Sequence, residues 1–564
     1  MCPGPVVATS DSQIMLHPNH ANRRFRLLSA MACCALVWSG LFSGCDQPDA
    51  GPRQQPSSKN KSASARSATG VTKKQGNTRG TTRRKRRRPR RLTRTTEAQS
   101  PGLDGADAIA AVTRAVDASL DLGPVLVVWL VDRSPSAAAL RRQVIPRVQE
   151  WYLGRPSTSG NAENLPRLHT AIITFGAEIE NALDPPTDQA AEVNRILENI
   201  QVDPSGREVT FAAIRSTLDK YLTFRTRQAH ELMLVVISDE AGDDTDQVDS
   251  LLEIPRKYSI PIYAIGVPAP LGRGAAVVAT VEATDGTASR SAPSIQQGPE
   301  SRKAERIDLE FPANLPLQLL DSGFGPFALE RLCRATGGRF LTLRPPPSGG
   351  LAFGTPTTVW PRGDIPQFDA EVMRRYAPDD LTAAEYDTLV AGNPAMSALR
   401  LAADLGHVEC LQQPPLEFVK PNEAALNRSL EAAQKLAAKQ LPRINQLYEL
   451  LRQGVGGRAT LERPRWQAAF DLAFGRAAAA KARADGYNQM LAALKRGRLF
   501  QDADSTIWVL EPDPSIESSS ALRTLIKKAK QAFTRVVEQH PHTPWSHIAQ
   551  QELQIPMGWR WSER

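Results

Sequence analysis

The sequence predicts a doubly wound, mainly parallel α/β sheet followed by an all-α region. Two fully apolar runs, VLVVWLVD at 125–132 and LMLVVISD at 232–239, alternate with segments of helical periodicity. Strands that are apolar on both faces are typical of parallel sheets covered by helices on each side. After Pro378 the chain becomes rich in Ala and Leu over long helix-periodic stretches, which predicts the all-α region.

The first 44 residues have the pattern of a signal peptide. Arginines 23, 24 and 26 precede an apolar stretch, 27–42, that is short for a membrane span. The stretch ends in LFSGC, which resembles the lipobox of bacterial lipoproteins, so Cys45 is the expected lipidation site. The resemblance implies an extracytoplasmic, membrane-anchored lipoprotein of the bacterial cell envelope. An ordinary cleaved signal or an uncleaved anchor helix is the alternative.

Residues 45–102 are expected to form a disordered basic tether. Residues 46–100 contain 16 Lys/Arg and 3 Asp/Glu, which gives this segment a net charge of +13. The net charge of the whole chain is only +9, so the rest of the chain is slightly acidic. The basic segment contains few apolar residues that could form a core, and its basic residues are most concentrated in RRKRRRPRR at 83–91. Behind an export signal this segment is expected to lie on anionic lipid or cell-wall polymer. Without export it would indicate nucleic-acid binding, which we consider the less favoured interpretation.

The strands and helices expected between 103 and 345 follow one another in a regular alternation. Helical periodicity is clear before the first apolar run and again in AAALRRQVIPRVQEWYL at 137–153, in spite of an internal proline. The further elements are a strand at 168–176, helices near 187–200 and 209–223, a helix around 246–258, a strand at 260–267, and a last helix and strand within 323–343.

Polar residues stand where the apolar strands end. Asp132, Ser134 and Ser136 follow the first run, Asp239 ends another, and Thr210 lies at the start of a predicted helix. In parallel sheets, ligands bind where the loops at the carboxyl ends of neighbouring strands converge. Hydroxyl and carboxylate oxygens without histidine or thiolate favour a hard cation, Mg²⁺ first and Mn²⁺ or Ca²⁺ next.

These residues carry a family resemblance. DRSPS matches the DxSxS motif of von Willebrand factor type A (vWA) domains, and Thr210 and Asp239 fall where the second and third loops of the metal-ion-dependent adhesion site (MIDAS) belong. The resemblance implies that Ser134, Ser136 and Thr210 contact the metal directly and that Asp132 and Asp239 hold it partly through water. It also implies an open coordination position that receives an acidic residue of a protein partner.

One residue departs from the family's pattern. Glycine commonly follows the third-loop aspartate, whereas Glu240 stands here. An additional carboxylate would either raise the affinity for a cation or repel acidic partners, so the sequence leaves the ligand preference open.

The rest of the chain is divided by composition. The vWA-like domain is expected at 103–345, with an insertion at 270–322, a Pro/Gly-rich linker at 346–380 and a helical region at 381–564. The linker contains RGD at 362–364, which we interpret as a chance match. Residues 521–553 faintly resemble a tetratricopeptide unit crossing into its neighbour, although no regular 34-residue repeat is visible.

The sequence does not favour catalysis. It has no Walker A loop, GxGxxG, HExxH or GxSxG motif, and the nearest histidine to Ser134 and Ser136, His169, begins another strand. Cys333 and Cys410 remain in the mature body, and the sequence leaves open whether they pair. His540, His542 and His547 lie close together and are expected to be exposed to solvent at a polar helix boundary.

The predicted function is therefore that of a membrane-anchored, extracytoplasmic, non-enzymatic binding protein that recognises a protein partner through a metal. One alternative is a structural or envelope scaffold with a vestigial metal site. The other is a basic nucleic-acid-binding protein.

Overall fold

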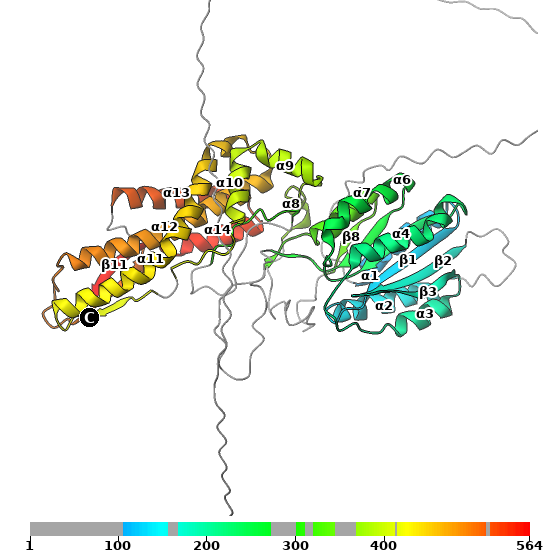
Figure 1. Ribbon diagram of the computed structural model, residues 1–564, viewed down its shortest axis with the longest axis horizontal. Helices are drawn as coiled ribbons and strands as arrows, with labels where there is room; N and C mark the ends of the chain where they lie inside the picture. Colours follow the sequence, from blue (N-terminus) through cyan, green and yellow to red (C-terminus); the bar gives the residue numbers. More distant parts are fainter. Residues whose placement is uncertain are drawn as a thin grey trace, which may run out of the picture. The chain divides into compact units, whose positions relative to one another are not determined.

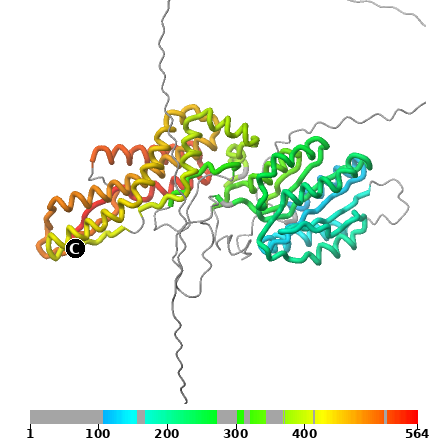
Figure 2. The backbone as a smooth tube through the Cα atoms, viewed as in Figure 1, coloured from blue at the N-terminus to red at the C-terminus, as the bar shows by residue number. Residues whose placement is uncertain are grey.

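The computed structural model describes residues 105–155, 167–271, 301–310, 320–343, 368–411, 414–514 and 519–564 (Figures 1 and 2). The predicted signal peptide, the lipidation site Cys45, the basic tether and the RGD sequence lie outside the described residues. So do residues 272–300 and 311–319 of the predicted insertion.

A six-stranded sheet has the order β3-β2-β1-β4-β5-β8 (Figure 1). Every neighbouring pair is parallel except β2 and β3, which are antiparallel. The predicted parallel sheet is therefore confirmed, with one antiparallel edge strand added. In sheet order the strands are β3 (Ile179–Thr187), β2 (Leu168–Phe175), β1 (Val125–Asp132), β4 (Glu231–Ile237), β5 (Ile262–Gly266) and β8 (Phe340–Thr342).

Helices cover both faces of this sheet, as predicted. Strand β1 is buried along its whole length. Its side chains Val125, Val127, Trp129 and Val131 pack with α1, α2 and α3, and those between them pack with α4 and α7. The helices are α1 (Gly105–Leu120), α2 (Ala138–Leu153), α3 (Ala190–Glu198), α4 (Thr210–Thr226), α5 (Val248–Leu251), α6 (Glu253–Tyr258) and α7 (Phe327–Thr336), with a 3₁₀ turn at Thr245–Gln247 before α5.

The C-terminal region is helical, as predicted. Its centre is α12, whose alanines are buried against α11 and α13. A Cβ atom on Gly475 would lie 2.6 Å from the Phe533 ring, so a glycine is needed for this close packing. The helices are α8 (Ala370–Arg374), α9 (Ala383–Ala391), α10 (Pro394–Ala403), α11 (Glu423–Gly454), α12 (Pro464–Lys495), α13 (Ser520–Gln539) and α14 (Pro544–Gln554), with a 3₁₀ turn at Val455–Thr460.

Two small sheets add to the prediction. The helical region includes an antiparallel sheet of order β11-β10-β9, and Trp508 and Trp561 of its strands pack on α11 and α12. A two-stranded pair, β6 with β7, borders residues 272–319. The strands are β6 (Pro270–Leu271), β7 (Leu320–Asp321), β9 (Glu417–Val419), β10 (Ile507–Asp513) and β11 (Gly558–Glu563).

Residues 301–310, expected to be part of an insertion, contribute to the core of the helical region. Ile307 and Leu309 are buried in that core. Leu309 forms a β-bridge with Val408, and Nη2 of Arg476 in α12 donates to the Leu309 carbonyl at 2.8 Å. This short segment therefore completes a hydrophobic core that is formed mainly by residues after 368.

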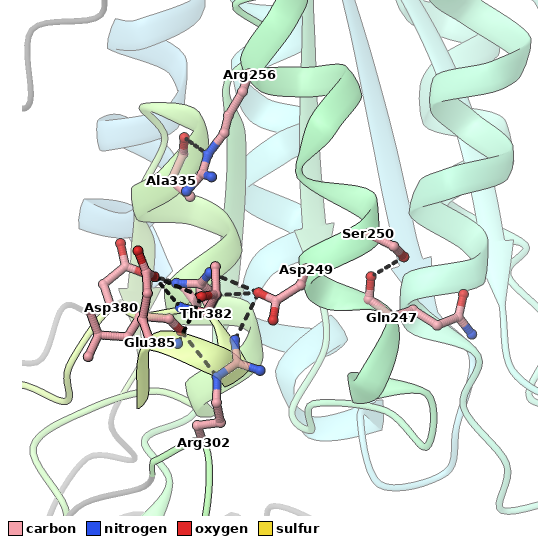
Figure 3. A network of polar contacts seen from close by, with 11 residues as sticks. Gln247, Asp249, Ser250, Arg256, Arg302, Ala335, Asp380, Thr382 and Glu385 are labelled. Atoms are coloured by element: carbon pink, nitrogen blue, oxygen red, sulfur yellow. Dashed lines mark hydrogen bonds and ion pairs between the residues drawn. The ribbon is translucent and has the colours of Figure 1, made fainter. Parts of the chain in front are cut away.

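An ion-pair network ties helices α5 and α7 to two other segments (Figure 3). Asp249 of α5 accepts hydrogen bonds from Nη2 of Arg302 at 2.8 Å and from Nε of Arg331 at 2.9 Å. Arg331, whose side chain is 2% exposed, also pairs with Asp380, and Nε of Arg302 donates to the Leu381 carbonyl at 3.1 Å. Because Arg331 is buried, its charge depends on these partners.

The structure settles two points that concern cysteine and histidine. Cys333 and Cys410 are buried, unpaired thiols in different hydrophobic clusters, so the open alternative of a disulfide is not realised. The expectation of solvent exposure is wrong for His540, which is 2% exposed and whose Nδ1 lies 3.0 Å from the hydroxyl oxygen of Tyr376. The polar sequence around His540 does not reveal that the end of α13 packs against Tyr376, whose ring in turn lies against Trp545.

We expect His540 to make the protein sensitive to acid. Burial lowers the pKa of His540 from 6.5 to about 4, against the opposing effect of the Asp471 carboxylate. Because the folded pKa lies below the unfolded value, stability should be full above pH 6.5 and should fall as the pH decreases towards 4. Urea midpoints measured by circular dichroism across this range should fall for the wild type and much less for His540→Asn. The exposed neighbour provides the control, since His542→Asn should behave like the wild type. An equal decline in His540→Asn would contradict the assignment.

Candidate functional site

The DxSxS loop leaves the end of the central strand and folds back on itself. Asp132 is the last residue of β1, and its Oδ1 accepts a hydrogen bond from the Ser134 backbone N–H at 2.7 Å. The hydroxyls of Ser134 and Ser136 share a hydrogen bond of 2.8 Å. All three side chains are at most 3% exposed. The loop therefore presents one carboxylate and two hydroxyls as a single buried cluster.

The second predicted aspartate joins this cluster from the neighbouring strand. Strands β1 and β4 are paired in parallel with Val131 opposite Ile237, so they end at the same level. The Ser136 hydroxyl donates to Oδ1 of Asp239 at 3.3 Å, and the Ser238 hydroxyl donates to Oδ2 of Asp132 at 2.8 Å. The carboxyl ends of these two strands therefore bring the predicted side chains into contact.

Thr210 is brought to the loop that carries Asp239. It is the first residue of α4, as predicted, and is fully buried. A Cβ on Gly242, whose φ is +86°, would lie 2.4 Å from Oγ1 of Thr210, so the two loops meet where only glycine fits. Oγ1 of Thr210 has no hydrogen-bond partner among the described residues. Because such a group is costly to bury, Thr210 Oγ1 is a candidate ligand atom.

Several residues that sequence analysis missed hold these loops in place. Nη1 of Arg141 in α2 donates to the backbone carbonyls of Asp132 and Ser134, at 2.6 and 2.8 Å. Asp244 accepts hydrogen bonds from the first free N–H groups of α4, those of Phe211 and Ala212, at 3.0 and 2.7 Å. An aspartate that directly precedes a helix can be recognised in the sequence as its N-cap. Asp244 instead caps a helix that begins 34 residues before it, and no local sequence pattern reveals this contact.

Glu208 is a further carboxylate at this site. It is 7% exposed and lies in the loop just before Thr210. Its Oε2 has no hydrogen-bond partner among the described residues. The charges of Asp132 and Asp239 act on it. Its sequence context, SGREVTF, gives no signal that would separate it from an ordinary exposed loop glutamate.

Burial and mutual repulsion make these carboxyl groups difficult to ionise. Burial raises the pKa of Asp132. Burial and then the charge of Asp132 raise the pKa of Asp239 to about 7. The same two causes raise the pKa of Glu208 to about 9. A positive charge placed among them would reverse all three shifts.

The donor set fits a hard divalent cation. The cluster offers carboxylate and hydroxyl oxygens, including the unpartnered Oγ1 of Thr210, and neither imidazole nor thiolate. Within the described ranges, no three His, Cys, Asp or Glu side chains gather closely enough to hold a metal by themselves. A cation at this site would therefore depend on Ser134, Ser136 and Thr210 as well as on the aspartates.

His169 does not belong to this site. It lies opposite Leu126 in the β1–β2 register, whereas Phe175 lies opposite Asp132. His169 and Phe175 are six residue steps apart, which corresponds to about 20 Å of extended strand. His169 therefore forms no Ser–His–Asp arrangement with the DxSxS loop in the part of the chain that the structure describes.

Comparisons with known proteins gave matches only among solved structures. No family model and no curated protein matches the chain. One similar structure is the SpRpn10 VWA domain, with 13% identity, 26% of this chain and 75% of that chain covered, and a TM-score of 0.21. Another is the conserved hypothetical protein BatB from Bacteroides thetaiotaomicron, with 14% identity, coverages of 40% and 92%, and a TM-score of 0.23. A third is proximal thread matrix protein 1 from the mussel byssus with a zinc-occupied MIDAS motif, with 15% identity, coverages of 26% and 36%, and a TM-score of 0.20.

These low identities and TM-scores carry no conclusion about function, partners or metal. The architecture itself identifies the domain. The domain has a mainly parallel sheet with helices on both faces. Its DRSPS loop lies beside the loop of Asp239, which in turn meets the loop of Thr210, as the family resemblance implies. The described residues of 105–271 and 320–343 therefore form a domain with the von Willebrand factor type A fold.

Proposed function

We propose that this domain binds a divalent cation and, through it, an acidic side chain of a protein partner. The observation that carries the proposal is the buried Oγ1 of Thr210, unpartnered beside a cluster of carboxylates and hydroxyls. Ser134, Ser136 and Thr210 would be direct ligands, and Asp132 and Asp239 would hold the cation partly through water. Mg²⁺ is the first choice for such oxygen ligands, with Mn²⁺ or Ca²⁺ next.

The bound cation would supply positive charge at a position where a partner's carboxylate can reach it. The chain's own residues would do the positioning: Arg141 fixes the DxSxS backbone, and Ser238 orients the Asp132 carboxylate. No step of bond making or breaking is required. We therefore propose a binding protein rather than an enzyme.

The proposed location is the cell envelope, with a lipid anchor at Cys45 and a basic tether that lies on anionic lipid or cell-wall polymer. This part of the proposal rests on the sequence. Among the described residues, no helix is both long and apolar enough to cross a bilayer. The mass of the mature N-terminus tests the anchor, since a diacylglyceryl group on Cys45 is expected and its absence would contradict it.

Metal binding should be direct and measurable. Calorimetric titration with Mg²⁺ and with Mn²⁺ should show one site in the wild type, and saturation at a hundred times the dissociation constant should stabilise the protein by about 2.7 kcal/mol. Thr210→Ala should weaken the affinity for the cation by about tenfold or more, because it removes the hydroxyl that is the proposed ligand. Asp219→Asn, on the exposed face of α4, is the matched control and should bind as the wild type does. Equal cation affinity in Thr210→Ala and the wild type would contradict the assignment.

Recognition of carboxylates should depend on the cation. On an array of peptides that each carry a single Asp or Glu, beside the matching Asn or Gln peptide, the wild type should retain only acidic members, and only with Mg²⁺ present. Asp132→Ala or a chelator should reduce retention to background, because the cation supplies most of the attraction for the carboxylate. Retention that survives both treatments would favour the scaffold interpretation. Retention that falls steeply with salt and requires residues 73–94 would favour the nucleic-acid interpretation.

A further inference from the structure

Glu208 is held at the candidate site by its own backbone. Its N–H donates to Oδ2 of Asp243 at 3.1 Å, and its carbonyl accepts from the Asp243 N–H at 2.8 Å. Gly242 lies against the same carbonyl, where a Cβ would approach to 3.0 Å. These contacts join the Glu208 loop to the loop that carries Asp239, so the side chain starts from a fixed point beside the cluster.

The side chain of Glu208 is buried without a matching positive charge. It is 7% exposed and Oε2 has no hydrogen-bond partner among the described residues. The charged groups that act on it are the carboxylates of Asp132, Glu240 and Asp239. Burying a carboxylate among other carboxylates destabilises a fold, so this position has no structural benefit in the absence of a cation.

We propose that Glu208 is an internal carboxylate ligand that takes the open coordination position of the cation while no partner is bound. The inference rests on the proposed metal binding and adds a regulatory element to it. Glu208 lies two residues before Thr210, a predicted direct ligand, and its backbone carbonyl is hydrogen-bonded to the loop that carries Asp239, which places the glutamate next to the proposed coordination sphere. A partner's carboxylate would bind by exchange with Glu208 rather than by filling a vacant position.

The proposal is tested by counting the waters on a bound Mn²⁺ ion in the full chain. Water-proton relaxation reports exchangeable water on Mn²⁺, and Glu208→Gln should increase it by the equivalent of about one water, since a neutral amide is a poorer ligand. The affinity for Mn²⁺ should fall by about tenfold. Acetate, a minimal carboxylate probe, should lower the relaxation of Glu208→Gln at smaller concentrations than it does for the wild type.

Two further variants keep the result specific. Glu208→Asp keeps the charge but shortens the reach by one methylene, so its relaxation should resemble that of Glu208→Gln. Glu178→Gln, an exposed glutamate in the loop after β2, should leave relaxation and affinity unchanged. Without metal, Glu208→Gln should melt at about the same temperature as the wild type near pH 7, because burial keeps the Glu208 carboxyl largely protonated and the variant replaces it with a neutral amide. A melting temperature close to that of the wild type would show that the variant is folded.

The outcomes separate this inference from the proposed function. Mn²⁺ bound equally by the wild type and by Glu208→Gln, with the same relaxation, would overturn the role of Glu208 and leave the metal site standing. Failure of every form to bind Mn²⁺, Mg²⁺ or Ca²⁺ would overturn the metal site itself.

Discussion

The site depends on the burial of acidic oxygens where two parallel strands end together. The register of β1 and β4 brings Asp132 and Asp239 to one level, and both are almost fully buried. In a medium of low dielectric constant, neighbouring carboxylates repel one another strongly and lose the stabilisation that water gives them. Hydroxyls and one backbone N–H compensate only part of this cost. The fold therefore creates a position where a cation would be stabilising.

The surrounding contacts fix the donors without needing that cation. Arg141 binds the backbone of the DxSxS loop from α2, and Asp244 caps α4, so Thr210 is placed by a helix terminus. Gly242 allows the closest approach of two loops at a φ that other residues rarely adopt. Because these contacts involve backbone groups, the oxygens are in place before any ligand arrives. Binding then costs little ordering.

The sequence predicted the central sheet because its strands are apolar on both faces, a pattern that little else produces. The sequence did not predict β3, whose residues IENALDPPT are largely polar and include two prolines. An edge strand can have such a sequence because one of its sides forms no backbone hydrogen bonds with another strand. DRSPS, Thr210 and Asp239 could be recognised because they follow elements of clear periodicity. Glu208 could not, since its burial comes from loops that meet only in three dimensions, and His540 was misjudged for the same reason.

Charge balance explains why exchange suits this site better than addition. The carboxylates of Asp132, Asp239 and Glu240 act on Glu208, and Arg141 acts on Asp132 and Asp239 from α2. A fifth carboxylate from a partner would add negative charge to a site that one divalent ion does not neutralise. If the partner's carboxylate replaces Glu208, the charge around the cation stays constant, and the displaced Glu208 carboxylate becomes solvated by water. Glu240, the departure from the family's pattern, would act in the same direction, since its charge would attract the cation and oppose simple addition of an acid. Selectivity for a partner would then come from contacts around the carboxylate rather than from the carboxylate alone.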